Sequence, residues 1–180
     1  MAHAYRAADA RQINPSDPWG RYNCSAYSVA RLLDYATLGG LVGVTGALVR
    51  ALSDEPIPDK NSPGLNIPQM VAVAHRLRVE LVDRTAAGWP ALMRYLQERR
   101  AILLQLDAFQ YPPELQTYRI AVDPFPHAVA LEWITSAGIS LYDPMVGKER
   151  YVTEAQLKPA ALALYPRVRF ATTRVVPWLE

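Results

Sequence analysis

The 180-residue sequence has few of the features that would indicate a function directly. It contains one cysteine, Cys24, which excludes an internal disulfide and a zinc site built from several thiolates. Its Lys and Arg residues number 19 against 17 Asp and Glu, and these charges are scattered instead of forming a basic stripe. We therefore expect no nucleic-acid partner. Because the three histidines have no further ligand residues at metal-binding spacing, we also expect no metal and no cofactor.

Long apolar runs are also missing. No segment approaches the roughly 18 consecutive apolar residues that a membrane-spanning helix needs. Residues 1–12 contain no apolar stretch of the kind found in a signal peptide. We therefore expect no membrane partner and a protein that is made and kept in the cytoplasm unless another route carries it out.

The sequence does contain enough apolar residues for one sizeable core. Hydrophobic residues make up 51% of the chain, which suits one globular domain. The pairs Asn14-Pro15 and Asp17-Pro18 disfavour a continuous helix near the start. We predict an extended N-terminal arm over residues 1–22 and a single domain over residues 23–180.

Helical patterns dominate the first half of the chain. Apolar residues recur at helical spacing over residues 24–36, and a pair of glycines follows. Asn66 and Gln69 have the spacing of a capping box, which predicts a helix that begins there. Residues 91–99, opened by a Gly-Trp-Pro sequence, predict a further helix.

Strand patterns dominate the second half. A long proline-rich loop over residues 110–126 precedes them, and a second capping box predicts a helix over residues 153–162. The predicted strands are residues 79–82, 101–106, 127–134, 139–142 and 167–176. Helices followed by an antiparallel sheet predict an α+β fold.

Three residues could together form a nucleophilic site. A thiol attacks at neutral pH only as a thiolate, a form that a helix N-terminus and a neighbouring imidazolium both favour. Cys24 lies in the first turn of a predicted helix. His127 opens one predicted strand and Asp143 follows the next, so antiparallel pairing brings the two together. Cys24, His127 and Asp143 are thus the candidate nucleophile, base and orienting group.

These residues resemble the pattern of papain-like cysteine peptidases that process bacteriocin leaders. Members of that family have a Cys at the start of a helix, a strand that begins His-Ala-Val and a hairpin return that ends Asp-Pro. The matching positions here are Cys24, residues 127–129 and residues 143–144. The resemblance implies a papain-like cysteine proteinase fold, with N-terminal helices packed on a C-terminal antiparallel sheet.

A closer resemblance is to small papain-like proteins encoded by actinobacterial phages. It covers most of residues 23–162, including the Asn-Cys-Ser start of the first helix. It implies hydrolysis of an amide or peptide bond in a peptide or protein substrate, either a peptide of peptidoglycan or a phage protein. Association with other virion proteins is a further expectation from this resemblance.

One position departs from the family pattern. Papain-like peptidases usually have a Gln six residues before the nucleophile, where it completes the oxyanion hole, and this sequence has Pro18 there. The side-chain amides of Gln12, Asn14 or Asn23 could replace it. The loss of one oxyanion donor typically costs about 100-fold to 1000-fold in turnover.

Other interpretations of the same residues remain open. Cys24 could be a packed small residue, His127 a strand-edge residue and Asp143 a turn former before Pro144. The fold could then act as a catalytically weak or inactive docking protein of a phage tail or capsid. The same triad could also transfer an acyl group to an amine instead of to water.

Overall fold

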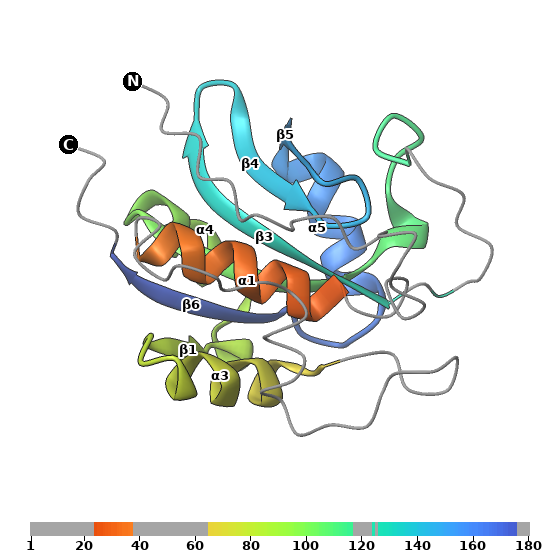
Figure 1. The fold of residues 1–180 in the computed structure, drawn as a ribbon. Helices are drawn as coiled ribbons and strands as arrows, with labels where there is room; N and C mark the ends of the chain where they lie inside the picture. Colours follow the sequence, from red (N-terminus) through yellow and green to blue (C-terminus); the bar gives the residue numbers. More distant parts are fainter. Residues whose placement is uncertain (1–23, 38–64, 117–123, 125, 176–180) are drawn as a thin grey trace.

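The computed structural model describes residues 24–37, 65–116, 124 and 126–175. The predicted arm over residues 1–22 lies outside the described residues. The first described element, α1 (Cys24–Ala36), is almost entirely buried. It lies across one face of a central sheet, as Figure 1 shows. In the part of the chain that the structure describes, no helix is long and apolar enough to cross a membrane.

The sheet has six strands, all paired antiparallel, in the order β1-β6-β2-β3-β4-β5. The strands are β1 (Leu81–Asp83), β2 (Arg100–Asp107), β3 (Pro126–Thr135), β4 (Gly138–Asp143), β5 (Lys148–Val152) and β6 (Arg169–Val175). Thus β2 and β3 lie at the centre, and β5 lies at one edge.

Helices cover both faces of the sheet. On one face, α1 and α3 (Ile67–Arg76) pack in one apolar cluster with Leu103 and Ala130 of the central strands. On the other face, α4 (Gly88–Gln97) and α5 (Glu154–Ala163) pack in a second cluster with Leu104 and Val129. Successive residues of a strand point to opposite faces. The unbroken apolar run in β2 therefore supplies both clusters.

Local signals account for several element ends. The capping box at Asn66 is formed in full: Asn66 Oδ1 accepts from the Gln69 N–H at 3.0 Å, and Gln69 Oε1 accepts from the Asn66 N–H at 2.7 Å. Gly138 begins β4 at φ +124°, and a Cβ there would lie 2.7 Å from the carbonyl oxygen of Val152. The tight connection between β3 and β4 therefore requires glycine at this position.

The α+β prediction is confirmed, and the predicted helices and strands named above are all present with ends shifted by a few residues. Two features were not predicted. β5, with the sequence Lys-Glu-Arg-Tyr-Val, is mostly exposed, and short 3-10 helices occur at Thr85–Ala87 and Ala108–Gln110. Part of the predicted loop over residues 110–126 lies outside the described residues.

Candidate active site

The N-terminal turn of α1 holds Cys24 at the edge of a pocket. Cys24 is buried, with 5% of its surface exposed. Two serines bond α1 to neighbouring segments. Ser28 Oγ donates to the carbonyl oxygen of Ala128 at 2.8 Å, and Ser25 Oγ accepts from the Leu65 N–H at 2.9 Å. The first bond ties α1 to β3, the strand that carries His127. Cys24 and His127 therefore belong to directly bonded elements.

His127 and Asp143 form a buried pair on adjacent strands. His127 Nε2 lies 2.9 Å from Asp143 Oδ1, and neither side chain is exposed. The same carboxylate oxygen accepts the backbone N–H of Met145 at 2.9 Å, in the turn after β4. Asp143 thus holds the imidazole by Nε2 and leaves Nδ1 as the nitrogen for proton exchange.

The electrostatics of this pair favour an imidazolium. Burial by itself lowers the pKa of His127, but the charge and hydrogen bond of Asp143 outweigh it, and a hydrogen bond and charge from Cys24 act in the same direction. The pKa of His127 therefore rises to about 10. Burial would raise the pKa of Asp143, yet His127 and the Met145 N–H hold it below its usual value. His127 is protonated and Asp143 ionised at neutral pH.

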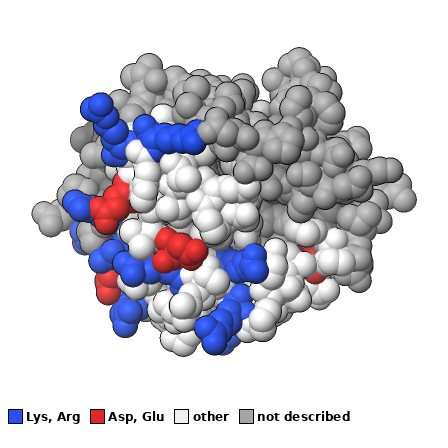
Figure 2. Space-filling view, turned by 90° about the horizontal axis from the view of Figure 1, so that it is seen from below, with Lys and Arg blue, Asp and Glu red and all other residues white. Residues whose placement is uncertain are grey.

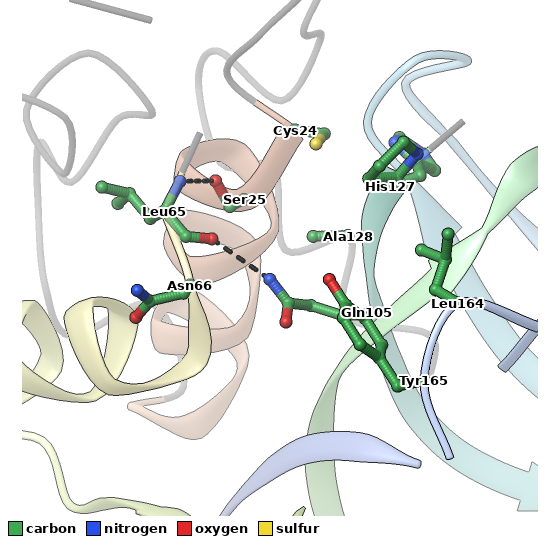
Figure 3. A pocket seen from close by; sticks show the side chains of 10 residues that line it. Cys24, Ser25, Leu65, Asn66, Gln105, His127, Ala128, Leu164 and Tyr165 are labelled. Carbon is green, nitrogen blue, oxygen red and sulfur yellow. Dashed lines mark hydrogen bonds between the residues drawn. The ribbon is translucent and has the colours of Figure 1, made fainter. Parts of the chain in front are cut away.

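Cys24 and His127 line one pocket, which has a volume of about 80 Å³. Figure 3 shows both residues on the same side of it. The other lining residues come from five segments of the chain: Ser25, Leu65, Asn66, Gln105, Pro126, Ala128, Leu164 and Tyr165. A small molecule or side chain in this pocket would therefore lie beside the thiol and the imidazole.

One wall of the pocket is tied down by side chains. Leu65 donates its N–H to Ser25 Oγ, and its carbonyl oxygen accepts from Gln105 Nε2 at 3.2 Å. Both backbone groups of Leu65 are therefore engaged by α1 and β2. A bound peptide cannot take the N–H of Leu65 without breaking the bond to Ser25.

A buried charge cluster holds the middle of α1. Arg31 Nε lies 2.5 Å from Glu132 Oε1 on β3, and Arg31 also pairs with Glu149 on β5. The Arg31 guanidinium stands over the ring of Tyr142 on β4, 5.2 Å from its centroid. One side chain of α1 thus contacts three neighbouring strands, including the two that carry His127 and Asp143.

The structure brings the three predicted residues together, with Cys24 and His127 in one pocket and Asp143 behind the imidazole. Reasoning from the sequence missed Leu65, Gln105 and Tyr165 as pocket residues, because no short motif marks them.

The oxyanion candidates Gln12, Asn14 and Asn23, and Pro18, lie outside the described residues. Among the described residues, no group of three or more His, Cys, Asp or Glu could hold a metal ion.

Two solved structures of peptidases resemble this chain. A protein described as a C39-like peptidase from Bacillus anthracis has a TM-score of 0.60 at 14% identity, over 86% of this chain and 90% of its own. The peptidase domain of Streptococcus ComA, a bifunctional ABC transporter of a quorum-sensing pathway, has a TM-score of 0.59 at 13% identity, over 91% and 95%. No family profile and no curated protein matches the chain. The predicted papain-like cysteine proteinase fold is thereby confirmed.

Proposed function

We propose that the protein is a cysteine hydrolase that cleaves an amide or peptide bond, with Cys24, His127 and Asp143 as its triad. The observation that carries this proposal is the buried His127–Asp143 pair, 2.9 Å apart, in contact with the only cysteine of the chain. The likeness of the fold to peptidase domains supports the same reaction class.

The proposed reaction passes through a thioester. In the reactive state the thiol proton of Cys24 already resides on His127, and the thiolate attacks the carbonyl carbon of the substrate. His127 then gives its proton to the leaving amine as the C–N bond breaks. In the second half, His127 takes a proton from water, the resulting hydroxide attacks the thioester, and the C–S bond breaks to leave the Cys24 thiolate beside the reprotonated His127. Asp143 stays ionised and stabilises the imidazolium in both halves.

The tetrahedral intermediate needs hydrogen-bond donors for its oxyanion. The backbone N–H of Cys24 is suited to this role, because the first N–H groups of a helix have no partner within the helix. The proposed second donor is a side-chain amide of Gln12 or Asn14 in the predicted arm, or of Asn23, which follows it.

The nucleophile is tested by alkylation. At pH 6, iodoacetamide should label Cys24 about tenfold faster than free cysteine, since the neighbouring imidazolium stabilises the thiolate. His127→Ala should lose this advantage, and Cys24→Ala should not be labelled at all. Labelling of the wild-type protein at the rate of free cysteine would contradict the proposal.

The setting of the reaction rests on the resemblance to phage-encoded proteins. We propose that the substrate is either a cell-wall peptide or a phage protein. Incubation with purified peptidoglycan or with phage structural proteins, followed by mass spectrometry, would detect new termini that are missing with Cys24→Ala.

Unchanged infectivity of a phage carrying Cys24→Ala, with the protein retained in the particle, would support a docking role instead. An added amine that appears in the product would indicate acyl transfer.

A further inference from the structure

The wall of the pocket across from the catalytic pair contains an uncommitted polar group. Tyr165 follows α5, and Figure 3 shows its hydroxyl oxygen pointing into the middle of the pocket, toward the side where Cys24 and His127 lie. Among the described residues, this hydroxyl has no hydrogen-bond partner. A hydroxyl can both donate and accept, so it could bind either kind of substrate group.

The ring of Tyr165 is held by a neighbour on β6. The guanidinium carbon of Arg169 lies 3.8 Å from the ring centroid, which is a close cation–π contact. This contact does not involve the hydroxyl. It therefore orients the side chain while leaving the polar end available to a ligand.

The surroundings of the hydroxyl define what it could select. The pocket has a volume of about 80 Å³, which is small beside the roughly 300–1,000 Å³ of typical ligand pockets and so suits a short side chain. Gln105 adds a carboxamide to the wall next to Tyr165, and its buried Oε1 atom has no partner among the described residues. Unpaired buried acceptors are uncommon in folded proteins. The pocket is thus small, with polar groups of Tyr165 and Gln105 among apolar lining residues such as Leu164.

We propose that Tyr165 is a substrate-binding residue that selects a short side chain with a hydroxyl or carboxamide group, in a residue close to the bond that is cleaved. This inference rests on the proposed function, because the selected residue lies in the pocket of the proposed nucleophile. A site built to bind a polar group discriminates against an apolar isostere, since the isostere leaves that group unpaired.

The test uses pairs of internally quenched peptides that differ only by Thr or Val at one position, taken in turn on both sides of the cleaved bond. Thr and Val have the same shape, so the pair isolates the hydrogen bond. At one position the wild-type protein should prefer Thr about 3-fold to 10-fold in kcat/KM, the worth of one neutral hydrogen bond. Tyr165→Phe, which keeps the contact with Arg169, should remove the preference. The matched control Tyr151→Phe, at an exposed site on β5, should retain it.

A binding measurement separates this inference from the proposed function. Dye-labelled versions of the same peptides are titrated with Cys24→Ala and with Cys24→Ala/Tyr165→Phe, and the Kd values are obtained by fluorescence anisotropy. A Thr preference in binding that Tyr165→Phe removes supports the inference even if the wild-type protein cleaves nothing, an outcome that would refute only the hydrolase proposal. A preference that survives Tyr165→Phe, equal affinity within every pair, or no binding of any peptide would overturn the inference.

Discussion

His127 is protonated although burial lowers the pKa of its imidazole. Asp143 raises this pKa by more than burial lowers it. The carboxylate contributes through its charge and through the bond to Nε2, and the turn after β4 fixes the carboxylate by the Met145 N–H. A side chain of the same shape without the charge would keep the position of the ring while removing most of what raises its pKa.

Asp143→Asn should therefore lower the pKa of His127 from about 10 toward and below its usual value of 6.5. The imidazolium would then be lost at a lower pH, because burial would no longer be opposed by a neighbouring anion. The pKa is measured by ¹H–¹⁵N NMR of the imidazole across a pH series. An unchanged titration in Asp143→Asn would mean that the carboxylate does not control the charge of the ring.

At the scale of elements, the Arg31 cluster joins α1 to the strands of the site. Burial raises the pKa of Glu132 to about 7, although Arg31 and the Ser140 hydroxyl on β4 oppose it, and Glu149 on β5 adds to the rise. Burial lowers the pKa of Arg31, but its two carboxylate partners outweigh this and raise it. Arg31 therefore stays charged, and Glu132 is the residue of the cluster that binds a proton as the pH falls.

Glu132→Gln should change how stability depends on pH. The pKa of Glu132 is higher in the folded protein, about 7, than its ordinary value of 4.5, so the folded state binds more protons between these values. As the pH rises from about 4.5 to 7, the wild-type protein should lose free energy of unfolding relative to Glu132→Gln. Urea denaturation of both proteins at several pH values measures this. If the unfolding free energies of the two proteins change in parallel between pH 4.5 and 7, the pKa of Glu132 is not raised by folding.

At the scale of the whole molecule, one sheet joins two apolar clusters. Helices α1 and α3 cover one face, and α4 and α5 cover the other. Neighbouring residues of β2 contribute to different clusters, as Leu103 and Leu104 do. On the face that Figure 2 shows, acidic residues lie among the basic ones.

Leu103→Ala and Leu104→Ala should therefore have similar effects, although they alter opposite faces of the sheet. Both side chains are fully buried, and each truncation should cost about 2–5 kcal/mol of unfolding free energy. Because β2 is shared, we expect one cooperative transition in both variants, with coincident urea curves from circular dichroism and tryptophan fluorescence. Curves that separate in one variant would show that the two layers unfold independently.

Local chemistry made much of this architecture predictable. Capping boxes act over three residues, and the β3–β4 hairpin closes over a short turn, so both could be inferred from neighbouring residues. β5 was not predicted because it is a short edge strand with three charged residues. It forms by pairing with β4, and its own residues do not indicate that partner. Leu65, Gln105 and Tyr165 were missed because they meet only in the folded chain.

The sequence by itself determined most of the helices and strands and placed His127 and Asp143 on the two arms of one hairpin, because these features depend on short-range periodicity and turn chemistry. Tertiary structure decided the rest. It brought α1 to β3 through contacts between residues a hundred positions apart, such as Ser28 and Ala128. It also buried the His127–Asp143 pair deeply enough to raise the pKa of the imidazole, and it turned the Tyr165 hydroxyl toward the thiol. Burial and long-range contact are properties of packing, which no local pattern encodes.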